Sequence, residues 1–164
     1  MAIEIPKVTK LKAKPPRELV ASPGFLLKRL GFRLKDRAST AFEAAGETPY
    51  CHGVLAVLAE GERETQATIA DALGWDRSYL VGLLDDLEER GYVERRRDTV
   101  DRRRHVVSIT PEGRKALARM RTLSAQLESE FLAPLDDKER ETLQRLLLKV
   151  AVHHDPRYAA NGDT

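Results

Sequence analysis

Apolar residues recur along the chain at the three- and four-residue spacing of one helix face, in several separate segments. The spacing predicts a first helix from Phe25 to about residue 45, with Gly46 in the position of a C-terminal cap. A second helix is predicted from Pro49 to Gly61, because proline suits a first helical turn and glycine suits a helix end. The apolar faces of these two helices are Leu27, Leu30, Leu34, Ala38, Ala41 and Ala45, and then Val54, Leu55 and Leu58.

Two shorter helices follow, and little more than a glycine separates them. In "TQATIADALG", Thr65 is predicted to cap the N-terminus and Gly74 to end the helix. In "WDRSYLVGLLDDLEERG", Asp76 is the predicted N-cap and Gly91 the end. This spacing describes a helix-turn-helix. The inward-facing residues are predicted to be Ile69, Leu73, Leu80, Leu83, Leu84 and Leu87.

A hairpin is predicted next, from the short runs "YVERRR" and "HVVSIT". The order of two short helices followed by a hairpin is the winged-helix arrangement. Thr110 and Pro111 then begin another helix, which Pro134 breaks, and Asp136 caps a last one. The fold class is therefore mainly α with a small β-hairpin wing. The faces of the last two helices are Leu117, Met120, Leu123 or Ser124, Leu127 and Phe131, and then Leu143, Leu146, Leu147 and Val150.

The charge of the chain is concentrated in the predicted wing. The 164 residues carry a net charge of only +2, yet residues 90–104 hold seven arginines and three acidic residues, which gives that segment +4. A basic segment on a nearly neutral body indicates contact with nucleic acid, although a solvated basic loop is the alternative. A guanidinium at the tip of a projecting hairpin can enter the narrow, negative minor groove, while the preceding helix enters the major groove.

Other features limit the remaining classes of function. Cys51 is the only cysteine, so the chain can form no intrachain disulfide, and a reducing cytosol is the expected compartment. No apolar run approaches the roughly 18 residues that span a membrane, and we expect a cytoplasmic protein. Residues 1–23 are rich in lysine and proline and are expected to form a flexible basic arm. The four histidines lack the spacing of metal ligands, and no phosphate loop or hydrolytic triad is present. We therefore expect no enzyme, cofactor or metal site.

The segment "RSYLVGLLDDLEERGYVERRRDTVDRRRHVVSITPEG", with "TQATIADALG" before it, resembles the MarR (multiple antibiotic resistance regulator) family of transcription factors. The resemblance covers roughly Pro49 to Leu117. It implies a homodimer, most often a repressor, that binds a palindromic operator in double-stranded DNA. By this pattern residues 24–48 and 111–164 form a helical dimerisation region, and residues 49–110 form the winged helix-turn-helix. Recognition helix 77–90 would enter the major groove, and wing 95–105 the minor groove.

The same resemblance assigns DNA-binding residues. Arg103 would be the wing arginine in the minor groove, Asp101 would orient it, and Thr65 would contact a phosphate. The base-reading face of the recognition helix would be Arg77, Ser78, Tyr79, Val81 and Gly82, and the wing would add Arg95, Arg102 and Arg104.

The recognition helix departs from the family pattern at three positions. Family members usually carry polar or basic residues where this chain has Val81, Gly82 and Asp86. Val81 can meet a thymine methyl group, whereas Gly82 is expected to read nothing and Asp86 to repel phosphate. This motivates an alternative, a winged-helix interaction protein with only non-specific DNA binding.

Two hypotheses concern regulation. Members of the family often bind phenolic or other amphipathic small molecules, and Phe42, Tyr50 and His52 are candidates to line such a cleft or to be ordinary core. The second is a redox sensor acting through Cys51, which requires an accessible and acidic thiol, whereas a buried or partly buried thiol is the other interpretation. Cys51 and His52 are neighbours on a helix and point about 100° apart, so they form no dyad by themselves.

Overall fold

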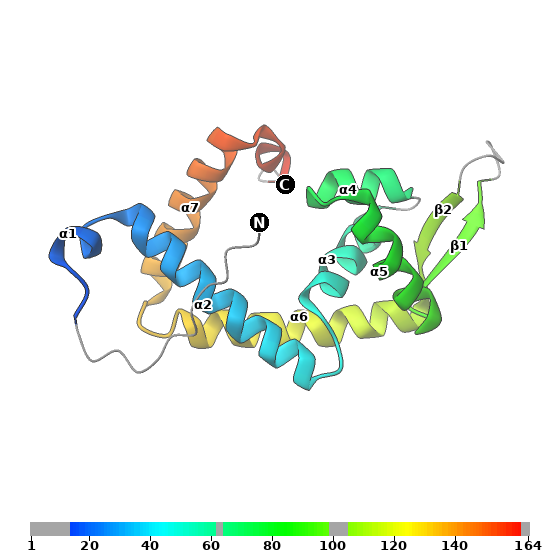
Figure 1. The fold of residues 1–164 in the computed structure, drawn as a ribbon, viewed down its shortest axis with the longest axis horizontal. Coiled ribbons are helices and arrows are strands. Elements are labelled where there is room, and N and C mark those ends of the chain that lie inside the picture. Colours follow the sequence, from blue (N-terminus) through cyan, green and yellow to red (C-terminus); the bar gives the residue numbers. More distant parts are fainter. Residues whose placement is uncertain (1–13, 62–63, 99–104, 162–164) are drawn as a thin grey trace. The chain divides into compact units, whose positions relative to one another are not determined.

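The computed structural model describes residues 14–61, 64–98 and 105–161. Figure 1 shows helices with one small hairpin, as the sequence predicts. The described elements, in order, are α1 (Arg17–Val20), α2 (Pro23–Ala44), α3 (Pro49–Glu60), α4 (Gln66–Leu73), α5 (Arg77–Glu89), β1 (Val93–Arg97), β2 (His105–Ile109), α6 (Pro111–Phe131), α7 (Asp137–His154) and the 3₁₀ helix η1 (Pro156–Asn161). The chain divides into two compact units, residues 1–37 and 38–164, and the division falls inside α2.

The first unit contains α1 and the beginning of α2. The sequence did not predict α1, whose four residues are all exposed. Helix α2 begins at Pro23, two residues before the predicted start at Phe25, and the Oγ of Ser22 accepts a hydrogen bond from the backbone N–H of Phe25 at 3.3 Å. The apolar face predicted for this helix lies exposed in the first unit, at Leu27, Leu30 and Leu34.

The second unit has the helix ends that the sequence predicts, because side chains satisfy the free N–H groups there. Thr65 accepts a hydrogen bond from the N–H of Thr68 at 3.2 Å, and the Thr68 hydroxyl accepts one from the N–H of Thr65 in return. Asp136 and Glu139 form the same reciprocal pair at the start of α7. Gly74 ends α4 with a φ of 65°, in the left-handed region that glycine adopts without strain.

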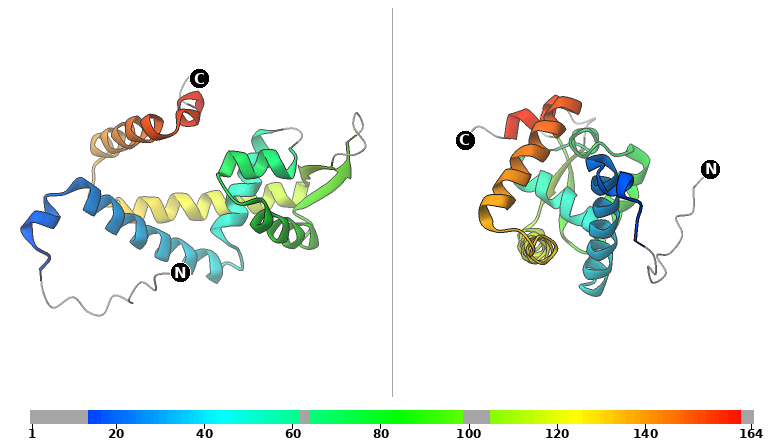
Figure 2. Two further views of the ribbon diagram at one scale, coloured as in Figure 1. Left: turned by 45° about the horizontal axis from the view of Figure 1, so that its top comes forward. Right: turned by 90° about the vertical axis from the view of Figure 1, so that its left-hand side faces the viewer.

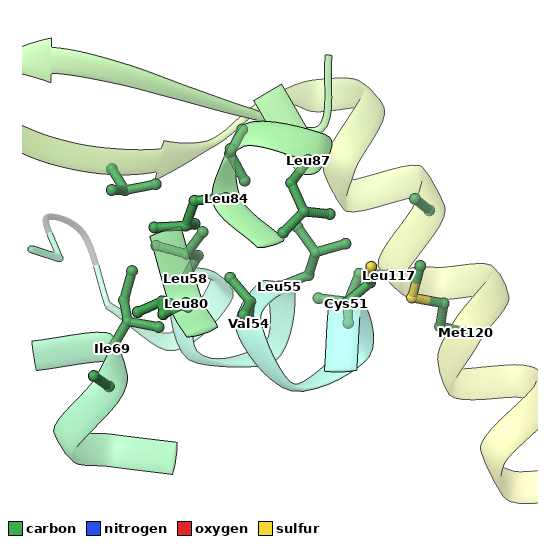
Figure 3. Packing of buried hydrophobic residues seen from close by; sticks show 14 of the residues in the cluster. Cys51, Val54, Leu55, Leu58, Ile69, Leu80, Leu84, Leu87, Leu117 and Met120 are labelled. Atoms are coloured by element: carbon green, nitrogen blue, oxygen red, sulfur yellow. The ribbon is translucent and has the colours of Figure 1, made fainter. Parts of the chain in front are cut away.

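The core of the second unit lies around α3, which contacts α4, α5, β2 and α6 (Figures 1 and 2). Figure 3 shows its buried side chains meeting those of α5 and of the first half of α6. The predicted inward faces of α3 and α5 are confirmed, except that Leu83 is only partly buried. The buried apolar residues are Phe42, Cys51, Val54, Leu55, Leu58, Ile69, Ala70, Leu80, Leu84, Leu87, Val93, Val107, Ala116, Leu117 and Met120.

The hairpin pairs β1 with β2 in antiparallel register, from Val93 opposite Ile109 to Arg97 opposite His105. Figures 1 and 2 show it projecting beyond the helices of the second unit. A bridge from Glu64 adds to its edge, because the N–H of Val107 donates a hydrogen bond to the Glu64 carbonyl at 2.7 Å. The buried side chains of Val93 and Val107 hold the base of the hairpin in the core.

The T-x-x-G sequence at the start of α6 joins this helix to the hairpin. Thr110 accepts a hydrogen bond from the N–H of Gly113 at 3.0 Å, which caps α6, and its hydroxyl donates to the carbonyl of Gly91 at 2.6 Å. A Cβ at Gly113 would collide with the carbonyl oxygen of Tyr92. Glycine therefore allows α6 to approach the chain at the point where the hairpin begins.

Helix α7 differs from the rest of the second unit because none of its residues is buried. Its predicted apolar face is largely exposed, with exposed fractions of 50% at Leu146 and 52% at Val150. In the described part of the chain, no helix combines the length and apolarity that crossing a membrane requires.

Candidate DNA-binding surface

The second helix of the helix-turn-helix, α5, has one buried and one exposed face. Its N-terminus is set by Asp76, whose carboxylate accepts a hydrogen bond from the N–H of Ser78 at 2.8 Å. A hydrogen bond from the Ser78 hydroxyl, together with this backbone bond, lowers the pKa of Asp76, so the cap is ionised at neutral pH. The residues predicted to read bases are all exposed: Arg77, Ser78, Tyr79, Val81 and Gly82.

Tyr79 lies in an aromatic cluster at the start of α5. Its ring centroid is 5.5 Å from that of Tyr50 and 6.2 Å from that of Trp75, and the rings pack edge to face. About half of Tyr79 is exposed, so one side of the ring supports the turn while the other faces solvent. The cluster fixes the position of the first turn of α5.

Thr65 uses its hydroxyl in the cap of α4, so its side chain is held at a helix N-terminus, where backbone N–H groups favour an anion. The predicted contact of Thr65 with phosphate remains a prediction. The wing-tip residues Asp101, Arg102, Arg103 and Arg104 lie outside the described residues.

Arg95 connects the wing to α5. Its guanidinium pairs with the carboxylate of Asp85 at 2.5 Å and with that of Glu88 at 3.5 Å, and only 21% of its side chain is exposed. Its backbone N–H also donates to Glu88 at 3.2 Å. Arg95 was predicted to contact DNA, and the structure shows its charge already paired within the protein. These contacts fix β1 against the recognition helix.

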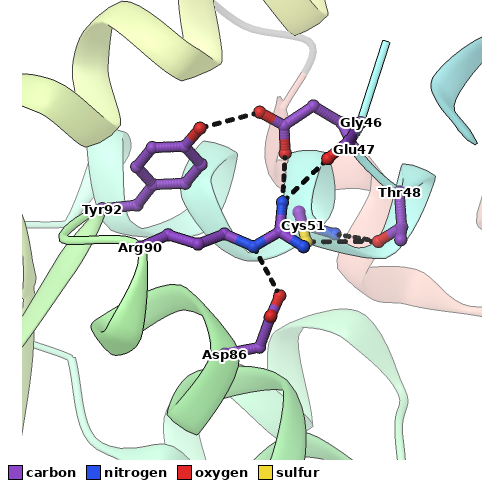
Figure 4. A network of polar contacts seen from close by, with 7 residues as sticks. All are labelled: Gly46, Glu47, Thr48, Cys51, Asp86, Arg90 and Tyr92. Atoms are coloured by element: carbon purple, nitrogen blue, oxygen red, sulfur yellow. Dashed lines mark hydrogen bonds and ion pairs between the residues drawn. The ribbon is translucent and has the colours of Figure 1, made fainter. Parts of the chain in front are cut away.

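A polar network joins the C-terminal end of α5 to the turn between α2 and α3 (Figure 4). The Arg90 guanidinium pairs with Asp86 at 2.9 Å and with Glu47 at 3.3 Å, and it donates to the Gly46 carbonyl at 2.8 Å. The Tyr92 hydroxyl donates to Glu47 at 2.9 Å. Burial and this bond to Glu47 raise the pKa of Tyr92, so the phenol remains a donor at neutral pH. The network positions the end of the recognition helix.

The network also changes the interpretation of Asp86. Its carboxylate is paired with Arg90, four residues later, so its charge is compensated within the protein rather than directed toward phosphate. Sequence reasoning missed this cluster. The four-residue spacing of Asp86 and Arg90 was visible in the sequence, but Glu47 lies more than 40 residues away and gives no local signal.

Cys51 does not meet the requirements of the redox hypothesis. It is 0% exposed, and the Thr48 hydroxyl donates a hydrogen bond to its Sγ at 3.2 Å. Burial raises the pKa of the thiol, which disfavours the reactive thiolate. The buried thiol that the sequence also allowed is confirmed, and the accessible, acidic thiol that the redox alternative requires is not found, because Cys51 faces the core from α3.

The three candidate effector residues do not form one group. The Phe42 ring stacks on the His52 ring with centroids 6.0 Å apart, whereas Tyr50 belongs to the aromatic cluster with Trp75 and Tyr79. The Nδ1 of His52 lies 3.2 Å from the hydroxyl of Ser124 on α6. Burial and the charge of Arg121 lower the pKa of His52, so its imidazole is neutral at pH 7. The described residues contain no group of three or more histidine, cysteine or acidic side chains placed to hold a metal ion.

The domain has two capped helices, α4 and α5, and α5 has one exposed face. The hairpin that follows is fixed to α5 through Arg95. This arrangement defines a winged helix-turn-helix DNA-binding domain. The comparisons agree with this class. The model of the MarR family matches residues 46–104. The putative transcriptional regulatory protein for the hcr operon of Thauera aromatica is 35% identical over 135 residues, which cover 77% of this chain and 81% of that protein. The chain belongs to the MarR family of transcriptional regulators.

Solved structures are similar over most of the chain. The repressor CouR bound to a 23-mer DNA duplex is 32% identical, with a TM-score of 0.76 over 85% of this chain and 99% of that one. CouR from Rhodococcus jostii RHA1 bound to p-coumaroyl-CoA is 28% identical, with a TM-score of 0.69 over 83% of this chain and 96% of that one. The fold and family expected from the sequence are confirmed.

Proposed function

We propose that the protein is a cytoplasmic homodimeric repressor that binds a palindromic operator and responds to an amphipathic effector. In this proposal α5 enters the major groove and the wing enters the adjacent minor groove. The observation that carries the proposal is the exposed face of α5, from Arg77 to Gly82, on a helix held at both ends by the Tyr79 cluster and the Arg90 network. A fixed helix with a free face suits base reading.

The two-fold symmetry of a palindromic operator requires two copies of the chain. The apolar faces of α2 and α7 support this assembly, because they are exposed in a single chain and a large exposed apolar area is typical of an interface. Residues 24–48 and 111–164 are the proposed dimerisation region. A groove between α6 and α7, lined mainly by Ala125, Leu132, Leu143, Leu147, Leu148 and Ala151, lies beside the apolar face of α7.

The proposed effector site lies at the junction of α2, α3 and α6. Phe42 and His52 stack there, and Ser124 and a neutral imidazole offer hydrogen bonds to a phenolic or carboxylic ligand. The complex of CouR with p-coumaroyl-CoA supports an aromatic effector. Its binding would change the spacing of the two recognition helices, which must match the groove repeat of about 10.5 base pairs.

The test is selection of bound duplexes from a random pool, followed by gel-shift titration against excess random DNA. We expect a palindromic site whose binding survives the competitor, because base contacts add to the phosphate contacts. Binding that the competitor abolishes would instead support the non-specific alternative.

A variant tests the wing. Arg103→Ala should reduce operator affinity strongly without changing the fold or the oligomeric state, since it removes the guanidinium proposed for the minor groove. Arg145→Ala, which removes an exposed arginine from α7, is the matched control. Equal binding by the Arg103 variant and the wild type at moderate salt would refute this role.

A further inference from the structure

Gly82 lies in the middle of α5, where nothing in the protein requires a glycine. Glycine is the least favourable residue after proline in a helix interior. The positive-φ glycines of the described chain are Gly46, Gly74 and Gly91, so the backbone at Gly82 suits any residue. A Cβ at Gly82 would meet no atom within 4 Å. Alanine would fit this position and favour the helix.

Two other helical glycines show what a packing requirement looks like. A Cβ at Gly53 on α3 would lie 3.2 Å from the Trp75 ring, and one at Gly113 would collide with the Tyr92 carbonyl oxygen. In both cases another part of the protein occupies the space of the missing side chain. At Gly82 that space is open on the exposed face, so packing within the protein does not require the glycine and a partner outside the chain can occupy the space.

The side chains around Gly82 leave a neutral notch. Ser78 and Tyr79 lie one turn before it on the same face, and Asp85 and Asp86 lie one turn after it. Each carboxylate has an arginine partner within the protein, Arg95 and Arg90 respectively. The notch therefore presents backbone flanked by an aromatic ring and by charges that are already compensated.

Hydrogen bonding cannot be the means by which this notch reads DNA. A glycine has no side-chain donor or acceptor, and the amide groups in the middle of α5 are used by the helix. What remains is shape. In the major groove, the group that distinguishes bases by shape alone is the C5-methyl group of thymine. Val81, the preceding residue, is 41% exposed and supplies apolar contact on the flank.

We propose that Gly82 and Val81 together read a thymine methyl group, Gly82 by leaving room for it and Val81 by contacting it. This inference rests on the proposed function, because it requires α5 to enter the major groove. It replaces the expectation that Gly82 reads nothing. The specificity of the helix is then carried partly by a missing side chain.

The experiment compares thymine with deoxyuridine, which lacks only the methyl group. Each thymine of the selected operator is replaced in turn, symmetrically in both half-sites, and the dissociation constant is measured by fluorescence anisotropy. At one position the wild type should lose about fourfold in affinity per half-site, the effect of burying one methyl group. Val81→Ala should reduce this preference toward one.

Gly82→Ala is the decisive variant. The added methyl should occupy the notch, so at that position the deoxyuridine duplex should bind more tightly than the thymine duplex. The variant should also melt at a higher temperature than the wild type, since alanine favours the helix, and loss of affinity would then not reflect unfolding.

Glu60→Ala is the control, because Glu60 is an exposed residue at the end of α3, outside both the proposed base-reading face and the proposed dimerisation region. It should keep the wild-type ratio of thymine to deoxyuridine affinity. An unchanged ratio in Gly82→Ala, with specific binding by the wild type intact, would overturn the inference and leave the proposed function standing. Absence of any specific site for the wild type would overturn both.

Discussion

Helices α3 and α7 carry the same kind of apolar spacing and have opposite environments. Helix α3 buries Cys51, Val54, Leu55 and Leu58, whereas α7 buries no residue. The difference shows that periodicity identifies the apolar face of a helix but not what covers it. In the single chain the face of α3 is covered by α5 and α6, and we propose that the face of α7 is covered by a second copy.

Helix α6 connects the two environments. Its first half buries Gly113, Ala116, Leu117 and Met120 against the winged lobe, and its later residues Leu123 and Leu127 are only partly buried. The lobe therefore has a core of its own, while the end of α6 is only partly buried and α7 buries no residue in the single chain. The following experiments test whether the two regions are stabilised in these different ways.

The largest expected effect is the loss of dimerisation in Val150→Asp. Because Val150 is half exposed in one chain, a carboxylate there should leave the winged lobe folded. In the proposed dimer the same carboxylate would be buried in the interface without a partner, which is unfavourable. Losing the second half-site should weaken operator binding by about 100-fold or more. Sedimentation analysis and gel-shift titration measure the two effects. Arg145→Gln makes the same change in net charge on the opposite side of α7 and should remain dimeric, so a monomeric control would contradict the assignment of the face.

Leu84→Ala should have the next largest effect, and it should act on the lobe. Leu84 is 0% exposed in the core, and removing such a side chain costs about 2–5 kcal/mol of unfolding free energy. Chemical denaturation measures the loss, which should be the same at low and high protein concentration. A loss confined to low concentration would show that the lobe is stabilised mainly by the partner.

Tyr92→Phe should have a smaller effect, because it removes one hydrogen bond and keeps the ring. The bond to the Glu47 side chain is expected to contribute about 1–2 kcal/mol to stability. Operator affinity should fall as well, because the network positions the end of α5. Tyr158→Phe, at an exposed tyrosine, is the control for thermal melting and DNA binding. Stability loss with unchanged affinity would limit the network to a structural role.

The smallest expected effect is a pH dependence of stability at His52. The folded pKa is lowered, so below the ordinary value of about 6.5 the unfolded chain binds more protons than the folded one. The contribution of His52 to stability is therefore complete above pH 6.5 and is lost as the pH falls. His52→Gln should reduce the slope of melting temperature against pH between about pH 7 and 5. His154→Gln, at an exposed histidine, should retain it.

Local sequence alone predicted the helices from α2 to α7, the hairpin, the helix caps and the class of fold. Thr65, Asp76, Thr110 and Asp136 begin helices in the structure as predicted, because a cap depends on atoms within three residues. Helix α1 was not predicted, because four residues are too few to show a helical period. The family, too, was visible in local motifs.

Contacts between distant side chains depend on how the elements pack, and the sequence did not predict them. The tertiary structure placed Tyr50 with Trp75 and Tyr79, paired Arg95 with Asp85, joined Glu47 to Arg90, and buried Cys51. The structure also shows that packing requires a glycine at position 113 and does not require one at position 82. The physical reason is range: helix periods and caps arise from neighbouring residues, whereas burial and ion pairing depend on distances between elements that packing sets.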